Sequence, residues 1–228
     1  MLLKSKITQI EMLSDEWRLQ RLFKFTSSKW YLLMGERGLG EQGLTYIRSK
    51  VGEFLSGVSS EVEFENDSTR HGNLYEVEGI KEFAKLMKIE FLVLQKLIHE
   101  QGSMTSSTPD ALWVRKESTD KLSYDVSTIE IKAFQNTAHV KMAECETPSD
   151  IKKAYAPVFW QIIHQMEECD CLTGYAVFYN PNFKVGGLRV IEFRKAALLD
   201  EFRLLKERKK LALETFEKIK NKLLNIKN

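Results

Sequence analysis

The chain has 228 residues, of which 43% are hydrophobic and 29% charged, and its formal net charge is +2. This composition is typical of a globular protein, and the length allows one compact domain with a sizeable core, which we expect to span residues 1–228. The small net charge excludes a global field that attracts polyanions, so affinity for nucleic acid has to come from local patches. No apolar stretch reaches the roughly 18 residues of a membrane span, and the charged first residues lack a signal-peptide core. The three cysteines are an odd count with no CxxC pair, which does not indicate a disulfide framework, so we expect a reduced cytoplasmic protein with no membrane partner.

The chain opens with three regions of helical character. Ser14 is a good cap for the first region, and apolar residues recur with helical spacing in the other two. A polar, acidic stretch over 57–69 is typical of a loop. The predicted helical ranges are 14–34 with a turn at 26–28, then 40–56, then 72–87.

Strand-like runs dominate the rest of the chain. One further predicted helix lies between them, and another follows the last of them. The predicted strands are 89–98, 111–115, 127–134, 173–179 and 187–194, and the predicted helices are 149–168 and 195–226. The last helix is long, amphipathic and rich in Lys and Arg. This order predicts a mixed α/β (α+β) fold, with a central mixed β-sheet flanked by helices.

Charged residues interrupt two of the predicted strands. A proline biases Asp110 toward an extended or turn geometry at the entry to a strand. In the next strand Ile129 and Ile131 point to one face, whereas Glu130 and Lys132 point to the other. If Asp110 lies on the neighbouring strand, its carboxylate, that of Glu130 and the backbone carbonyl of Ile131 form an oxygen set suited to Mg²⁺ or Mn²⁺. A Glu-x-Lys pair on a half-exposed strand is also typical of a structural ion pair, so the spacing alone leaves both interpretations open.

Three other polar side chains could join such a site. Glu76 lies in the first turns of the predicted 72–87 helix, where it is a third candidate carboxylate or simply a favourable acidic residue near a helix N-terminus. Gln161 and Gln165 are four residues apart and share a helix face, so they could hold a water or a phosphate oxygen, or serve only in packing. His164 lies on the same helix and is a further candidate to approach the site.

Five short segments, in order along the chain, resemble motifs of one nuclease family: GNLYE, STPDALW, IEIK, WQIIHQM and GYAVFYNP. Together they resemble the PD-(D/E)XK nucleases, specifically the phage lambda exonuclease and YqaJ-like viral recombinase group. DEWRLQRLFKFTSS resembles the amino-terminal segment of this family, and NPNFKVGGLRVIEFRK resembles its final hairpin. The resemblance implies a restriction-endonuclease-like core with a helical N-terminal segment and a long C-terminal helix.

Carried over by position, the resemblance also implies roles for single residues. Asp110 and Glu130 match the metal ligands, Lys132 the catalytic lysine, and Glu76 the helix carboxylate that completes the acidic site. Gln161 is a candidate for the catalytic glutamine, with Gln165 as the alternative. Relatives commonly carry a Gln-x-Gln pair in this helix, but here Ile163 stands at the second position.

A second set of residues matches a phosphate-binding role. Arg21 and Ser28 stand where this family receives the terminal 5′-phosphate of DNA, and a guanidinium fork and a hydroxyl near a helix start are good phosphate partners.

The activity that the resemblance implies is Mg²⁺-dependent 5′-to-3′ degradation of linear double-stranded DNA, with Mn²⁺ able to replace Mg²⁺. The 3′ single-stranded overhangs that remain would enter phage-type homologous recombination, in the host cytoplasm if the chain is phage-encoded. The implied partners are double-stranded DNA ends, a single-strand annealing protein, and two further copies of the chain in a homotrimeric ring. Two alternatives stay open: a PD-(D/E)XK endonuclease of the restriction or junction-resolving type, and a non-catalytic DNA-binding module of the same fold.

Overall fold

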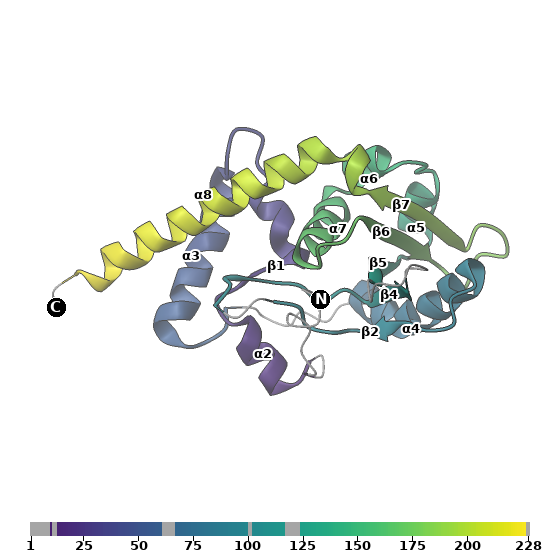
Figure 1. Ribbon diagram of the computed structural model, residues 1–228, viewed down its shortest axis with the longest axis horizontal. Coiled ribbons are helices and arrows are strands. Elements are labelled where there is room, and N and C mark those ends of the chain that lie inside the picture. The colour runs from purple at the N-terminus through teal and green to yellow at the C-terminus, as the bar shows by residue number, and fades with distance from the viewer. Residues whose placement is uncertain (1–9, 11–12, 61–66, 100–101, 117–123, 227–228) are drawn as a thin grey trace.

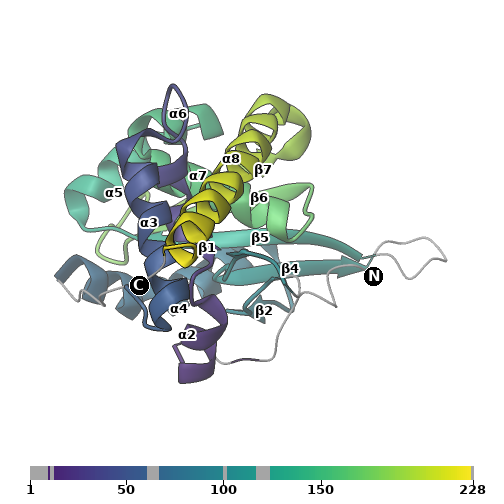
Figure 2. The ribbon, with the colours of Figure 1, turned by 90° about the vertical axis from the view of Figure 1, so that its left-hand side faces the viewer.

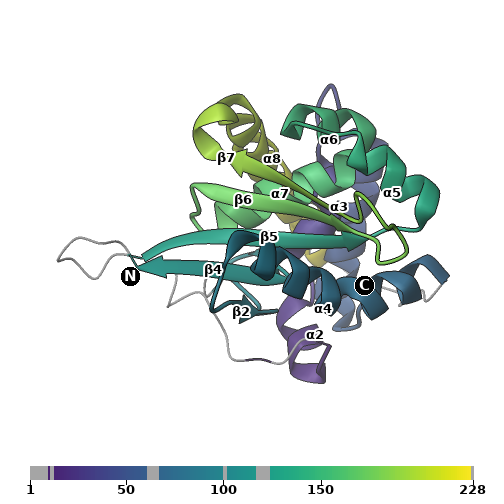
Figure 3. The same cartoon turned by 90° about the vertical axis from the view of Figure 1, so that its right-hand side faces the viewer.

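The computed structural model describes residues 10, 13–60, 67–99, 102–116 and 124–226. A five-stranded mixed sheet lies at the centre, with helices on both of its faces (Figures 1 and 3). The strand order is β2-β4-β5-β6-β7, in which β5 and β6 run parallel and the other neighbours run antiparallel. The strands are β2 (Val93–Leu94), β4 (Ala111–Lys116), β5 (Tyr124–Ala133), β6 (Thr173–Tyr179) and β7 (Leu188–Arg194).

Strand β6 shows why the sheet is covered on both sides. Successive side chains of a strand point to opposite faces, and in β6 both sets are apolar and buried. Tyr175 and Val177 pack with helix α4 (Asp67–Met87) in a small core, whereas Ala176 and Phe178 pack in the main core with helix α7 (Ala156–Glu168). The predicted mixed sheet flanked by helices is therefore confirmed.

The predicted helix 149–168 is two helices. A capping box at Thr147 and a proline in the first turn start α6 (Pro148–Ala154), and the chain breaks at Tyr155 before α7 begins. The break has a physical reason, because a proline at 157 inside a continuous helix would remove a hydrogen bond and clash with the preceding turn. The single-helix prediction was wrong at this point.

The predicted strand 89–98 is also largely wrong, because only Val93–Leu94 forms a strand within it, and Ile98 makes an isolated antiparallel bridge to Ser107. Gln95 takes a positive φ of 44° directly after β2, which ends the extended run. Its backbone N–H donates to the carbonyl of Asp110 instead, at 3.1 Å.

Three short elements have no counterpart in the sequence prediction. Helix α5 (Asn136–Ala143) follows β5, and β1 (Phe25–Thr26) pairs in parallel with β3 (Thr105–Ser106). A two-residue strand or a two-turn helix is too short for a hydrophobic period to emerge, so none of them left a pattern. Helix α4 also begins at Asp67, five residues earlier than predicted; residues 61–66 of the predicted loop lie outside the described ranges.

The predicted 14–34 helical region is helix α2 (Asp15–Arg21), strand β1 and the 3₁₀ helix η1 (Ser27–Leu33), and α3 (Gly40–Ser56) follows as predicted. The predicted terminal helix begins as a 3₁₀ turn, η2 (Lys195–Ala197), and continues as α8 (Leu199–Leu224). Among these helices, η1, α3 and α8 pack on one another, and η1 and α8 also pack on α7. Figure 2 shows α8 beside α3, where the rings of Phe54 and Phe216 meet edge to face.

Two expectations from the sequence concern membrane-spanning helices and disulfides. No helix among the described residues is long and apolar enough to cross a membrane. The three cysteines, Cys145, Cys169 and Cys171, are buried and form no disulfide with one another.

Candidate active site

The first part of the site is the junction of β4 and β5. The register pairs Ala111 with Ile129, so Asp110, just before β4, lies beside the carboxyl-terminal half of β5. Its Oδ2 accepts a hydrogen bond from the backbone N–H of Ile131 at 2.6 Å. The condition that the sequence left open, that Asp110 lies next to the strand carrying Glu130, is therefore met.

Alternation along β5 separates its apolar and charged side chains as predicted. Ile129 and Ile131 pack in the small core beneath α4. Glu130 and Lys132 point to the opposite face, toward α7. The Lys132 ammonium donates to Glu130 Oε1 at 2.5 Å, and the Glu130 side chain is only 1% exposed against 30% for Lys132.

Helix α7 places two amides against the same carboxylate. Gln161 donates to Glu130 Oε1 and Gln165 donates to Glu130 Oε2. Positions four apart lie on one helix face, which explains how both side chains reach one partner. Glu130 thus accepts hydrogen bonds from three donors, and its orientation is fixed from both sides.

Ile163 lies elsewhere on α7. It is 0% exposed and belongs to the main core. At about 100° per residue, position 163 points roughly opposite to the face that carries Gln161. The position of the family's second glutamine is therefore taken by a core residue. The hydrogen bond to Oε2 of Glu130 comes instead from Gln165.

Glu76 approaches from the other side of β5. Helix α4 lies very close to the strand at Gly79, where a Cβ atom would stand 2.8 Å from Cγ2 of Ile131. This close approach holds the turn that carries Glu76 near Lys132. Glu76 Oε1 accepts from the side-chain amide of Gln95 at 2.8 Å.

Gln95 is a site residue that the sequence did not reveal. Its side chain binds the Glu76 carboxylate, and its backbone N–H binds the main-chain carbonyl of Asp110 at 3.1 Å, so it links the side chain of Glu76 to the backbone that carries Asp110. It fell within a run interpreted as a strand, and the positive φ that turns it toward the site leaves no sequence signal.

The charges of these residues affect one another. Burial raises the pKa of Asp110 well above its usual range, and the neighbouring Glu130 and Glu76 raise it further. Burial also raises the pKa of Glu76, and Glu130 adds to this effect while Gln95 and Lys132 oppose it. Burial alone would lower the pKa of Lys132, but Glu130, Asp110 and Glu76 outweigh it and raise that pKa. Three carboxylates therefore crowd around one ammonium.

The donor set suits a hard divalent cation. Among the described residues no three His, Cys, Asp or Glu side chains stand close enough together to form a ready metal site. However, Asp110 and Glu76 each keep one carboxylate oxygen without a hydrogen-bond partner in the described part of the chain. A cation between them would stabilise ionised carboxylates that crowding and burial now disfavour, and oxygen ligands of this kind are those that Mg²⁺ and Mn²⁺ prefer. The residues present thus fit the metal by chemistry.

Helix α2 is tied to the same junction. The indole N–H of Trp17 donates to Oγ1 of Thr108 at 3.3 Å, two residues before Asp110. The guanidinium of Arg21 stacks over the Trp17 ring, 4.1 Å from its centroid. Arg21 also lines a hollow of about 340 Å³, together with Asp15, Trp17, Arg18, Leu22, Lys50, Glu53 and Ser59.

Ser28 lies outside that hollow. It is the second residue of η1, exposed, and its hydroxyl is 3.5 Å from that of Thr26. The structure therefore places Arg21 on α2 and Ser28 on η1, with β1 between them, and brings only Arg21 into the hollow.

His164 does not reach the carboxylates. Its ring is buried and stacks on Trp30 at 3.8 Å, and its Nδ1 pairs with the Ser27 hydroxyl at 2.7 Å. Glu168 lies 3.5 Å from its other nitrogen. Burial lowers the pKa of His164 to about 3, a shift that Lys209 reinforces and Glu168 opposes. This histidine joins η1 to α7.

A family model of the YqaJ-like viral recombinase domain matches residues 16–175. No curated protein matches the chain.

Solved structures show the same fold. The alkaline exonuclease LHK-Exo from Laribacter hongkongensis is 18% identical with a TM-score of 0.67, covering 92% of this chain and 98% of that chain. The same enzyme in complex with dAMP gives 19% identity and a TM-score of 0.67. A phage-related exonuclease from Haemophilus somnus 129PT is 15% identical with a TM-score of 0.64, covering 88% of this chain and 96% of that chain.

Proposed function

Because the chain belongs to the YqaJ-like viral recombinase family, we propose that it is a phage-type exonuclease that degrades linear double-stranded DNA from its 5′ ends. The observation that carries this proposal is the convergence of Asp110, Glu130 and Lys132 at the β4–β5 junction, with Glu76 beside them. The likeness to two exonuclease structures supports it.

Asp110 and Glu130, with the backbone carbonyl of Ile131 and with Glu76, would hold Mg²⁺, or Mn²⁺ in its place. When bound, such an ion polarises a phosphate oxygen and lowers the pKa of a water.

The side chains of this chain have separate tasks. Gln161 and Gln165 hold the Glu130 carboxylate in one orientation, and Lys132 shares its Oε1. The Lys132 ammonium would donate to the attacking water or to a phosphate oxygen that gains negative charge. Preorganised donors of this kind typically contribute about 10²–10³-fold in rate.

Arg21 would receive the terminal 5′-phosphate. Its guanidinium is already ordered by stacking on Trp17, and Trp17 is bonded to Thr108 at the entry to the Asp110 strand. A phosphate held there would place the first phosphodiester bond of the 5′-ended strand toward the carboxylates. Ser28, on η1 and outside the hollow, would complete this contact.

The proposal also covers the DNA product of the reaction, the protein partner and the oligomeric assembly. Removal of the 5′-ended strand leaves a 3′ single-stranded overhang, the substrate of a single-strand annealing protein in recombination. A homotrimeric ring around the DNA is the assembly that the family resemblance implies.

The test compares two DNA substrates in Mg²⁺: a linear duplex with 5′-phosphates and a covalently closed circle. We expect nucleotide release from the linear duplex only, with a label at the 5′ end released before a label at the 3′ end of the same strand. Cutting of the circle would favour the endonuclease alternative. If neither substrate were hydrolysed while DNA still bound, the chain would be a binding module.

A further inference from the structure

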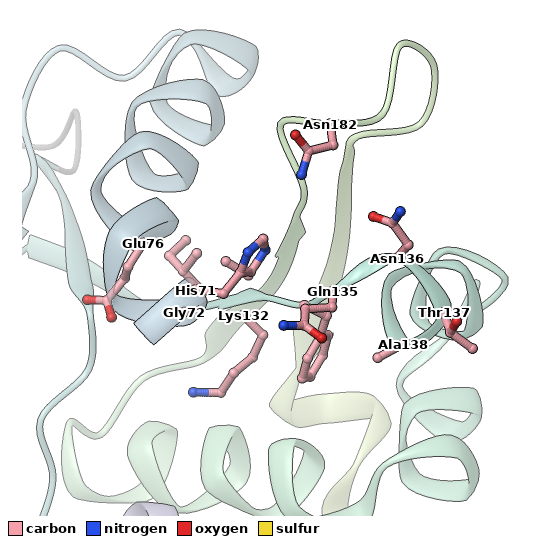
Figure 4. Close-up of a pocket in the computed structure, with 12 residues that line it drawn as sticks. His71, Gly72, Glu76, Lys132, Gln135, Asn136, Thr137, Ala138 and Asn182 are labelled. Carbon is pink, nitrogen blue, oxygen red and sulfur yellow. The ribbon is translucent and has the colours of Figure 1, made fainter. Parts of the chain in front are cut away.

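A second hollow adjoins the candidate active site on the side of α5. It has a volume of about 780 Å³, within the roughly 300–1,000 Å³ typical of small-ligand pockets. Glu76 and Lys132 lie at one end of it, and α5 and the loop between β6 and β7 form the other walls (Figure 4). We call this hollow the amide groove, after the side chains that line it: Gln135, Asn136 and Asn182.

The side chains that line the amide groove differ chemically from those that line the hollow around Arg21. That hollow carries two arginines and a lysine, groups that bind phosphate, beside two carboxylates. In the amide groove beyond Lys132 and Glu76, the polar lining consists of neutral amides, a hydroxyl and an imidazole, set among apolar side chains. The two hollows share no lining residue. Amides both donate and accept hydrogen bonds, and so match the edges of nucleobases rather than phosphates.

Several of these groups have no partner in the described part of the chain. The side chains of Gln135 and Asn182 make no hydrogen bond there, and Nε2 of His71 is covered yet unpaired. Asn136 uses its Oδ1 to accept from Asn180 at 3.2 Å, which leaves its NH₂ group available. Figure 4 shows these side chains gathered around the groove.

The walls of the groove are fixed in advance. Asn180 is fully buried and also donates to the carbonyl of Phe134 at 2.9 Å, which joins the end of β6 to the segment after β5. The buried ring of His139, on α5, pairs with the carbonyl of Gly186 in the β6–β7 loop at 2.9 Å. A site that needs no rearrangement binds its ligand at a lower entropic cost.

We infer that the amide groove binds one unpaired nucleotide next to the scissile phosphate, with its base held by the amides of Gln135, Asn136 and Asn182 and by the His71 ring. This inference rests on the proposed exonuclease function, because Lys132 and Glu76 connect the groove to the centre that would cut the strand. It adds to that function a subsite for the base, separate from the phosphate-binding hollow.

The test measures the dissociation constant of a 5′-phosphorylated single-stranded oligonucleotide in EDTA, where metal-dependent hydrolysis cannot occur. The variant Gln135→Ala/Asn182→Ala removes two exposed amides and leaves the core intact. The matched control Gln42→Ala/Asn221→Ala removes one exposed glutamine and one exposed asparagine from α3 and α8. We expect binding about tenfold weaker for the groove variant, as two lost hydrogen bonds suggest, and unchanged binding for the control.

A second arm asks whether the base is what binds. An abasic residue is placed in turn at each of the first few positions of the oligonucleotide. At one position, we expect the abasic oligonucleotide to bind the wild type about as weakly as the intact oligonucleotide binds the groove variant. At that same position, the abasic change should not weaken binding to the groove variant any further. Equal binding by wild type and groove variant, or abasic effects of the same size in both, would overturn the inference.

Nucleotide release from linear duplex in Mg²⁺ separates this inference from the proposed function. If the wild type binds with the expected pattern but releases no nucleotide, the exonuclease proposal fails while the groove stands as a nucleotide-binding site. If it releases nucleotide and the groove variant binds and turns over like the wild type, only the groove inference fails.

Discussion

At the scale of single residues, the site depends on how one buried carboxylate is compensated. Glu130 is almost inaccessible, and a buried charge is tolerated only when it is paired and hydrogen-bonded. Lys132, Gln161 and Gln165 supply that compensation from two elements. Strand alternation in the sequence was enough to predict that Glu130 and Lys132 share a face. It could not show that α7 would supply both glutamines to the same carboxylate, because that depends on how the helix crosses the sheet.

The position of Ile163 leads to a prediction about stability. Ile163→Gln buries an unpaired amide in the main core, so we expect a loss of about 2–4 kcal/mol in the free energy of unfolding and no gain in nuclease rate. Denaturant unfolding measures the free energy of unfolding, and nucleotide release measures the nuclease rate. The control Ile163→Val should cost only about 0.5–1.5 kcal/mol. A stable, faster Ile163→Gln enzyme would show that this position can face Glu130 after all.

The stacked guanidinium of Arg21 leads to a prediction about substrate ends. Arg21→Gln removes a charge-assisted contact, so we expect KM for a 5′-phosphorylated duplex to rise roughly 10–100-fold. KM for a 5′-hydroxyl duplex should hardly change, because that end offers no phosphate to Arg21. Arg37→Gln, at an exposed arginine, serves as the control and should behave as wild type on both ends. Equal effects of Arg21→Gln on the two ends would refute the phosphate-binding role.

At the scale of elements, sequence periodicity predicted most helices and the longer strands. It was wrong where contacts with other parts of the fold determine the local secondary structure. The run 89–98 has the composition of a strand, but the hydrogen bond from Gln95 to Asp110 and a positive φ end it after Leu94. The break between α6 and α7 was visible as a proline in the sequence, whereas the long apolar run around it favoured a single helix. Elements of two residues, such as β1 and β3, became strands only through their pairing.

Helix α7 also gives a prediction about pH, through His164. This ring has a folded pKa of about 3, so between that value and the ordinary value of about 6.5 the unfolded chain binds a proton that the folded chain does not. The stability that the neutral His164 ring contributes is therefore fully present above about pH 6.5 and is lost as the pH falls, by up to about 1.4 kcal/mol per pH unit. Glu168 and Lys209 face the same ring, and Lys24 faces Glu168.

The measurement is the free energy of unfolding between pH 7 and pH 5 for the wild type and for His164→Gln. As the pH falls, the wild type should lose more stability, or gain less, than the variant, and the two slopes should differ by about the contribution of one proton. The raised pKa values of Asp110 and Glu76 act in the opposite direction, but equally in both proteins, so the difference between the slopes reports on His164. The lowered pKa of Glu168 acts in the same direction, but only near or below the ordinary pKa of a carboxylate, outside this window. Parallel slopes for the two proteins would show that His164 does not stay neutral in the fold.

At the scale of the whole molecule, the sequence order of elements predicted the fold class but not the sheet order. The parallel pairing of β5 with β6 requires the chain to travel through three helices before it returns, and no local pattern encodes such a contact. That connection is what brings α7 over β5. The family motifs, read in order, indicated that the charged residues belong together, and the register of β4 on β5 explains how Asp110 reaches them.

The central claim is that the carboxylates at the β4–β5 junction carry out phosphodiester hydrolysis. The most direct test is the rate of nucleotide release from a linear 5′-phosphorylated duplex in Mg²⁺ by the wild type, by Asp110→Asn and by Glu207→Gln, which changes an exposed carboxylate on α8. We predict that Asp110→Asn is slower by about 10³-fold or more, a loss of several kcal/mol in transition-state stabilisation, while Glu207→Gln equals the wild type. Wild-type rates for a folded Asp110→Asn protein would contradict the account.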